Sequence, residues 1–331
     1  MPKKILSRAP VRICDIGGWT DTWFYQKGAV LNFSVDLFSY IYLIENKSQE
    51  IRIISDNLGI QTIIPDYNSI EYNGNLDLIK AGIKILEISK GLDIHIKTEA
   101  PPGSGMGTSA SLAVALIGAL AKIAEVDFSS GEIAKLAHTL ETKELKLESG
   151  VQDQYAAAFG GVNFMNINYP SVDIENIQIT ENKILELEKQ IILLFIGPRS
   201  SNEMHKAVIK NFKKGDPKTL KSLEIMKNCA KKMRTVINSN TEAIGKIMNE
   251  NWNAQKELHP LMTNQLIEKA ESIAFESSAL GFKCNGAGGG GSITILSSIE
   301  NEYELRQKYL KNNFTILPCK LCFEGVKSVE L

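Results

Sequence analysis

The sequence has no excess of charge of either sign, because 37 Lys and Arg residues oppose 38 Asp and Glu residues among its 331 positions. Proteins that bind nucleic acid or an anionic membrane over a broad surface usually carry a basic excess, so we expect neither partner. Any phosphate must therefore be recognised by a local site. Disorder of the whole chain is also excluded, since 44% of the residues are hydrophobic.

Long hydrophobic runs are missing as well. The longest apolar stretch covers residues 110–120 and is closed by Lys122. A membrane-spanning helix needs about 20 such residues, so this stretch predicts a buried helix. The first residues, MPKKILSR, lack the apolar centre of a signal peptide.

Cysteine is scarce, and its count of five is odd. With no signal peptide, this favours reduced thiols and a cytoplasmic protein. Cys319 and Cys322 form a C-x-x-C pair that resembles half of a zinc site. Neither a second pair nor a nearby histidine completes it, so we expect ordinary strand positions there.

The order of predicted elements indicates an α+β protein with two lobes. The first half combines short β-branched or aromatic runs with helices, and the second half is mainly helical over residues 202–280. We place the boundary so that residues 1–195 and 196–331 form the two domains. Strands are expected at residues 11–16, 29–35, 39–44, 51–54, 94–97, 162–166, 191–196 and 293–296, and helices at residues 76–89, 131–147, 152–159 and 300–310. A further helix of small residues is expected to follow the break at residues 101–103 and to end near residue 123.

The strongest motif is PPGSGMGTSAS at residues 101–111, which opens the predicted buried helix. Three alternating glycines allow the backbone to approach a ligand and turn its amides inward. The N-terminus of a helix adds unpaired N–H groups and a positive dipole end, so the loop suits a polyphosphate. Thr108 and Ser109 supply hydroxyls, one of which can bind Mg²⁺. No lysine precedes them, so this is not a Walker-type loop, and the alternative is a turn that merely caps the helix.

Two further motifs are weaker when taken alone. The sequence NGAGGGGS at residues 285–292 matches the letters of a dinucleotide fingerprint, but a strand follows it, which favours a loop that another backbone or a ligand approaches. The sequence RAPVRICDIGGWTD at residues 8–21 carries a cation on a strand and a carboxylate after a Gly-Gly turn. That combination suits a polyol next to a phosphate, and a surface ion pair is the alternative.

The three motifs, in this order, resemble those of the GHMP kinases, and the resemblance covers nearly the whole chain. The segment GGWTDT at residues 17–22 resembles the sugar-kinase branch, with fucokinase and D-glycero-D-manno-heptose 7-phosphate kinase. The segment QDQYAAAFGG at residues 152–161 points toward the heptose kinase. The resemblance implies a two-lobed fold. Its first lobe would be like domain 2 of ribosomal protein S5 and would bind ATP, and its second lobe would be ferredoxin-like.

The resemblance also implies roles for individual residues. Asp153 would act next to the acceptor hydroxyl as general base or orienting group, although it could instead cap the next helix. Arg12 would hold charge on the transferring phosphoryl group or lower the proton affinity of the hydroxyl, and an ion pair with Asp15 or another carboxylate is the alternative. Ser109 and Glu141 would bind Mg²⁺, with Glu144 and Glu148 as nearby alternatives to Glu141. The nucleotide loop would comprise Pro102, Gly103, Ser104, Gly105, Met106, Gly107, Thr108 and Ser109.

The substrate would lie on the remaining motif residues. Asp21 matches the sugar-binding aspartate of galactokinase, but Gly18 and Trp19 stand where galactokinase has Glu and His, which argues against galactose itself. Trp19 could stack on a sugar or pack in the core. Arg199, after a predicted strand, is a candidate for a distal substrate phosphate. The expected substrate contacts are Gly18, Trp19, Thr20, Asp21, Arg199, Gly288 and Gly289.

The sequence thus predicts an ATP- and Mg²⁺-dependent phosphotransferase that acts on the anomeric hydroxyl of a small-molecule sugar. D-glycero-D-manno-heptose 7-phosphate is the first choice, and a free sugar of the fucokinase, arabinokinase or galactokinase type is the second. Mevalonate or homoserine is disfavoured by Asp21. A non-catalytic ATP and sugar sensor is the alternative from another class. No stretch of the sequence marks a dimer surface, so the sequence does not decide between a monomer and a homodimer.

Overall fold

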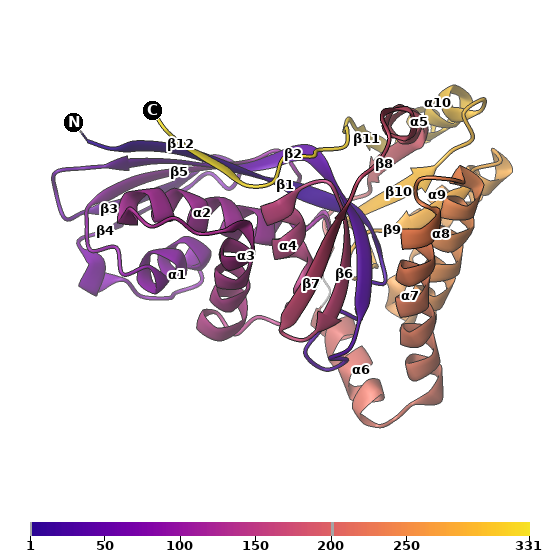
Figure 1. The fold of residues 1–331 in the computed structure, drawn as a ribbon, viewed down its shortest axis with the longest axis horizontal. Coiled ribbons are helices and arrows are strands. Elements are labelled where there is room, and N and C mark those ends of the chain that lie inside the picture. The colour runs from indigo at the N-terminus through magenta and orange to yellow at the C-terminus, as the bar shows by residue number, and fades with distance from the viewer. Residues whose placement is uncertain (1, 200–201) are drawn as a thin grey trace.

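The computed structural model describes residues 2–199 and 202–331 and has two lobes, each built on its own sheet (Figure 1). The first sheet has eight strands in the order β12-β1-β2-β5-β3-β4, and β6 and β7 extend it from β2. Its strands are β1 (Lys4–Ile16), β2 (Ala29–Glu45), β3 (Ile51–Ser55), β4 (Ile60–Ile64), β5 (Leu92–Thr98), β6 (Val162–Asn168), β7 (Ser171–Ile177) and β12 (Lys327–Glu330).

Helices cover one face of this sheet (Figure 1). The central helix, α2, begins right after the glycine loop and consists of small and apolar residues that are buried on nearly every side. Such a helix fits because β1 and β2 lie on one side of it and α1, α3 and α4 on the other. The helices of this lobe are α1 (Asp77–Ile85), α2 (Thr108–Ala124), α3 (Ser130–Thr139) and α4 (Gln152–Phe159), with a 3₁₀ turn at Tyr67–Ser69 and a π-helix at Leu140–Glu144.

The second sheet has four antiparallel strands in the order β11-β8-β10-β9. Its strands are β8 (Ile191–Phe195), β9 (Gly281–Cys284), β10 (Ser292–Leu296) and β11 (Thr315–Leu317). The helices of this lobe are α5 (Glu181–Gln190), α6 (Asn202–Lys213), α7 (Pro217–Val236), α8 (Thr241–Lys256), α9 (Gln265–Glu276) and α10 (Glu302–Lys311), with a 3₁₀ turn at Pro260–Met262. Within residues 2–199 and 202–331, no helix is both long and apolar enough to cross a membrane.

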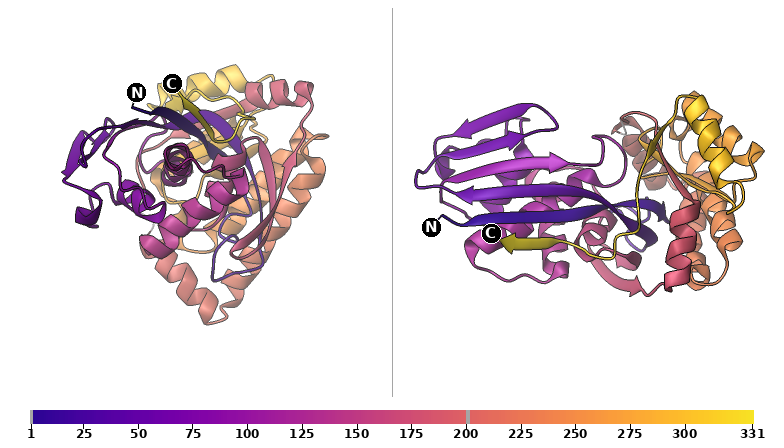
Figure 2. Two further views of the ribbon diagram at one scale, coloured as in Figure 1. Left: turned by 60° about the vertical axis from the view of Figure 1, so that its left-hand side comes forward. Right: turned by 90° about the horizontal axis from the view of Figure 1, so that it is seen from above.

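The chain crosses between the lobes more than once. Strand β8, at the predicted domain boundary, pairs with strands of the second sheet, and the C-terminal strand β12 returns to pair with β1 (Figure 2). The α+β fold with two lobes is therefore confirmed, and a division of the chain at residue 195 stays a prediction.

Some predicted elements differ from the observed ones. The two strands expected at residues 29–35 and 39–44 form the single strand β2, whose pairing with β1 shifts register between Pro10 and Val11 and again between Ile13 and Ile16. The helix expected at residues 131–147 becomes α3, which ends at Thr139 and continues as the π-helix. Arg12 lies between the two register shifts, where irregular pairing re-aims side chains.

Candidate active site

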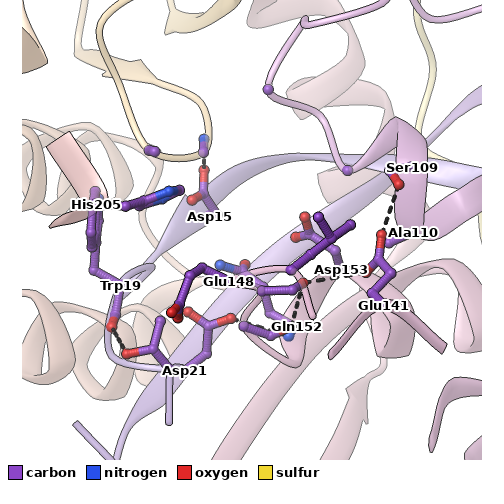
Figure 3. Close-up of a pocket in the computed structure, with 18 of the residues that line it drawn as sticks. Asp15, Trp19, Asp21, Ser109, Ala110, Glu141, Glu148, Gln152, Asp153 and His205 are labelled. Atoms are coloured by element: carbon purple, nitrogen blue, oxygen red, sulfur yellow. Dashed lines mark hydrogen bonds between the residues drawn. The ribbon is translucent and has the colours of Figure 1, made fainter. Parts of the chain in front are cut away.

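A cavity of about 620 Å³ lies where the two lobes meet, and all three motifs contribute to its wall (Figure 3). The first lobe supplies the glycine loop, the start of α2, the π-helix and the start of α4. The second lobe supplies α6 and the second glycine loop. The lining residues that belong to the predicted site are Arg12, Trp19, Asp21, Gly103, Ser104, Gly105, Gly107, Thr108, Ser109, Glu141, Asp153 and Arg199.

The glycine loop lines this cavity with Gly103, Ser104, Gly105 and Gly107. Gly103, Gly105 and Gly107 have φ angles of +71°, +74° and +73°, a conformation that favours glycine. The Ser104 amide donates to the Pro101 carbonyl over 3.1 Å, whereas the amides of residues 105–110 have no acceptor in the described part of the chain. Gly107 is the N-cap of α2, and no side chain caps that helix end. No side chain thus caps this turn, and its amides could accept an anion as partner.

Arg12 and Asp153 form an ion pair across this cavity. The Arg12 Nε donates to Asp153 Oδ1 over 2.8 Å, and its Nη1 donates to the Gly105 carbonyl over 2.5 Å. Asp15, the alternative partner, lies farther away, with 3.8 Å between Arg12 Nη1 and its Oδ1. Asp153 does not cap α4. The N-cap position is Val151, and no side chain makes a capping hydrogen bond at that end of the helix. A Cβ atom on Gly107 would lie 3.0 Å from Asp153 Cγ, so the carboxylate adjoins the glycine loop.

Ser109 and Glu141 place hard oxygen donors side by side. The Ser109 hydroxyl donates to Glu141 Oε1 over 2.7 Å, and the other carboxylate oxygen accepts from Gln154 and Ser149. Glu141 belongs to the π-helix, a local widening that is frequent at functional sites. Burial is the main cause that raises the pKa of Glu141 above its ordinary value. Within the described residues, no group of three or more His, Cys, Asp and Glu side chains is arranged to hold a metal ion.

Asp21 is buried at the end of the cavity opposite Ser109 (Figure 3). Its Oδ2 accepts a hydrogen bond from the Gln152 amide over 3.2 Å, at the start of α4. Burial and then the charge of Asp153 raise the pKa of Asp21 to about 6. A buried carboxylate with so few donors gains from hydroxyl groups that donate to it.

Trp19 and His205 form one wall of the cavity from opposite lobes. Their rings meet edge to face with 4.8 Å between centroids. Trp19 is almost fully buried in an apolar cluster, and it has a φ of +73°. Burial and then the charge of Arg199 lower the pKa of His205 to about 4, so the ring is neutral near pH 7. Trp19 therefore packs mainly in the core, and it also lines the cavity.

Arg199 lies between the two glycine loops. Its guanidinium would contact a Cβ atom on Gly105 or Gly286, and its backbone amide donates to the Gly103 carbonyl over 3.3 Å. Its Nη1 is buried and has no hydrogen-bond partner in the part of the chain that the structure describes. A half-buried cation with a shielded, unpartnered nitrogen is suited to an anion that enters the cavity.

Six residues expected at the site do not line the cavity. Pro102 is exposed outside it, and the Met106 side chain is in the core while its carbonyl accepts from the Arg12 amide over 3.0 Å. Gly18 packs on Asp15, and the Thr20 hydroxyl donates to the carbonyls of Gly17 and Ala29. Gly288 and Gly289 face Met262, Leu261 and Met204, and Gly286 and Ala287 reach the cavity instead.

Sequence reasoning missed several cavity residues, chiefly His205, Lys206 and Ile209 on α6 and Lys146 in the loop before α4. Neither segment carries a motif. Only the approach of the second lobe brings α6 to the first, so no local signal in the sequence marks it.

Comparisons with known proteins agree with this geometry. The model of the GHMP kinases N terminal domain matches residues 76–161. The chain is 30% identical to D-glycero-alpha-D-manno-heptose 7-phosphate kinase from Campylobacter jejuni over 98% of this chain and 99% of that protein. It is also 30% identical to the bifunctional fucokinase/GDP-fucose pyrophosphorylase of Arabidopsis thaliana, over 93% of this chain but 31% of that longer protein.

Among solved structures, a D-glycero-D-manno-heptose 1-phosphate kinase from Bacteroides thetaiotaomicron superposes with a TM-score of 0.82 over 99% of both chains, at 23% identity. The fold and the cavity between the lobes define a phosphotransferase with an alcohol group as acceptor. The chain belongs to the GHMP kinase family.

Proposed function

We propose that this chain transfers the terminal phosphoryl group of ATP to the anomeric hydroxyl of D-glycero-D-manno-heptose 7-phosphate. The observation that carries the proposal is the full-length similarity to a heptose 7-phosphate kinase, together with a cavity that joins the glycine loop to Arg12, Asp153 and Asp21. The sugar class has the further support of a second sugar-kinase relative, the plant fucokinase.

The glycine loop fits the phosphates of a nucleotide. Its amides at residues 105–110 have no acceptor within the described residues, and they lie at the N-terminus of a 17-residue helix. Phosphate oxygens accept from such amides, and the helix dipole favours their negative charge. Arg199 would add a cation on the side of the loop that faces the second lobe.

Mg²⁺ fits the pair formed by Ser109 and Glu141. The ion prefers a few oxygen ligands and keeps several waters, and a hydroxyl and a carboxylate that meet at 2.7 Å provide such oxygens. When bound, Mg²⁺ would neutralise phosphate charge. The absence of a cluster of three acidic or imidazole ligands in the described residues agrees with an ion bound largely through phosphate and water.

Asp153 and Arg12 would interact with the acceptor hydroxyl of the sugar. Asp153 would accept its proton or orient it, and Arg12, which donates to Asp153, would keep that carboxylate in place and add positive charge where negative charge develops. Asp21 would accept hydrogen bonds from the sugar. Arg199 adjoins Gly105 of the nucleotide loop, which favours a nucleotide phosphate as its partner over the predicted distal substrate phosphate.

Fucose phosphorylation is the second candidate, favoured by the 30% identity to the bifunctional plant enzyme. Both candidates use the same carboxylates, and they differ in whether the substrate carries a phosphate. A sensor without catalysis is disfavoured, since Arg12, Ser109, Glu141 and Asp153 line one cavity.

The test is release of ADP by the purified protein with Mg²⁺ and each of four acceptors: heptose 7-phosphate, L-fucose, D-galactose and mevalonate. We expect the highest kcat/KM with heptose 7-phosphate, and no ADP release above background from Asp153→Asn. Higher kcat/KM with fucose would establish the second candidate. Activity on mevalonate alone would overturn the choice of a sugar.

A further inference from the structure

Behind the cavity wall, a fully buried lysine of the second lobe pairs with Asp15 of the first lobe. Lys283 in β9 donates from Nζ to Asp15 Oδ1 over 3.2 Å, and both side chains are shielded from solvent. The same carboxylate oxygen accepts from the Gly286 amide over 2.9 Å. Asp15 therefore receives two donors from the segment that carries the second glycine loop.

Lys283 has no capacity left for a ligand. Its ammonium group has three N–H donors, and three acceptors surround it: Asp15 Oδ1, the Gln255 side-chain oxygen at 3.1 Å and the Cys284 carbonyl at 2.9 Å. Lys283 is also not among the residues that line the cavity, whereas Asp15 is. Any effect of this lysine on the reaction must act through its partner.

Asp15, the partner of Lys283, competes with Asp153 for the Arg12 guanidinium. Arg12 has two carboxylates nearby, Asp153 in a hydrogen bond at 2.8 Å and Asp15 at 3.8 Å, beyond hydrogen-bond distance. Without Lys283, Arg12 would be the remaining cation within 4 Å of the Asp15 carboxylate among the described residues. Coulomb attraction at low dielectric would then draw the guanidinium toward Asp15 and away from Asp153.

We propose that Lys283 is a positioning residue for phosphoryl transfer: by occupying Asp15 it leaves the Arg12 guanidinium directed at Asp153 and the cavity. The device links the lobes, because the lysine comes from β9 and the arginine from β1. The inference rests on the proposed function only for its kinetic readout.

The experiment compares Lys283→Met with the double variant Asp15→Asn/Lys283→Met, using whichever acceptor the unmodified protein phosphorylates. We expect Lys283→Met to lower kcat by about tenfold or more while KM for ATP stays within about threefold, because the displaced group acts on transfer and not on nucleotide binding. The double variant removes the competing charge, so it should recover most of the lost kcat. Each rate is divided by the concentration of folded protein, and the folded fraction is measured by circular dichroism.

Lys80 provides a matched control. It is a second fully buried lysine, paired with Asp77 Oδ1 at 3.0 Å, and it is not among the residues that line the cavity. Lys80→Met should lower the melting temperature without changing kcat. If Lys80→Met and Lys283→Met lowered kcat equally, or if the double variant were no faster than Lys283→Met, Lys283 would have only a structural role and the proposal would fail.

An NMR measurement that needs no substrate tests the role of Lys283 independently of which acceptor the protein phosphorylates. In protein labelled with [¹⁵N]arginine, the Nε signal of Arg12, assigned with Arg12→Lys, should shift in Lys283→Met and return toward its original position in the double variant. An unchanged signal would overturn the positioning role, whichever acceptor proves active. If Lys283→Met does not fold, the signal in the double variant should still match that of the unmodified protein.

Discussion

Arg12 and Asp153 are 141 residues apart in the sequence, yet the Nε of one donates to the Oδ1 of the other over 2.8 Å. The contact joins the first motif on β1 to the start of α4. It also adjoins the glycine loop, because Arg12 Nη1 donates to the Gly105 carbonyl. A carboxylate, a cation and a glycine loop at a helix N-terminus thus meet in one place, and phosphoryl transfer would require such an arrangement.

The first prediction concerns that carboxylate. Asp153→Asn keeps the shape of the side chain and its capacity to accept from Arg12, but it removes the basicity and the charge. We expect kcat to fall by about 100-fold or more, because positioned bases contribute rate factors of this order. The dissociation constant of ATP, measured by calorimetry, should stay within a few-fold. Full turnover by this variant would show that Asp153 has no part in catalysis.

The second prediction concerns Mg²⁺. Ser109→Ala removes the hydroxyl that meets Glu141, so we expect the Mg²⁺ concentration for half-maximal activity to rise by about tenfold. Ser111→Ala is the control on the same helix, since its hydroxyl donates to the Ala9 carbonyl over 2.7 Å instead. That variant should lose about 1 kcal/mol of stability with an unchanged Mg²⁺ requirement. Equal Mg²⁺ curves for both variants would remove Ser109 from the metal site.

The third prediction separates backbone strain from function in the glycine loop. Gly107 has a φ of +73°, and a Cβ atom there would lie 3.0 Å from Asp153 Cγ. Gly59, in the turn before β4, has a φ of +61° and no described atom within 4 Å of such a Cβ. Both alanine variants should lose about 1 kcal/mol in urea unfolding. Only Gly107→Ala should lower kcat, by about 10- to 100-fold, because it displaces Asp153. A similar loss in Gly59→Ala would refute this account.

Much of this site could be predicted from the sequence, because its parts lie in short motifs with local chemistry. Glycines at alternate positions before a small-residue helix indicate an anion loop in any fold. The pair of Lys283 and Asp15 could not be predicted in this way, since the two residues are 268 positions apart and neither the lysine nor its strand carries a signal. The lobes must first pack before β9 reaches β1.

The second glycine loop illustrates the same limit at the scale of single residues. Six consecutive positions contain five glycines, and composition does not tell which of them face a ligand. Gly286 and Ala287 face the cavity because the Gly286 amide is held by Asp15, and Gly288 and Gly289 turn toward Met262 and Leu261. Tertiary contacts, and not the local sequence, therefore determine which residues of this loop face the cavity.

The charged form of Asp21 lowers the stability of the folded protein, because the carboxylate is buried. Burial and then the charge of Asp153 raise its pKa to about 6 from an ordinary value of 3.8. Between these two values the folded state binds more protons at this group than the unfolded state does. The contribution of Asp21 to stability therefore falls as the pH rises from about 4 to about 6, and above that range the full penalty persists.

Asp21→Asn should accordingly stabilise the protein while it impairs substrate binding. At pH 7.5 we expect the free energy of unfolding in urea to rise by up to about 3 kcal/mol, from 1.36 kcal/mol per pKa unit, and at pH 5 by clearly less. KM for the sugar should rise by about tenfold or more, since the carboxylate that we propose accepts from sugar hydroxyls would become an amide. Both measurements are needed, because a stability gain with unchanged KM would show that Asp21 is a buried charge without a role at the sugar. A loss of stability at pH 7.5 would instead show that its contact with the Gln152 amide outweighs the cost of burying the charge.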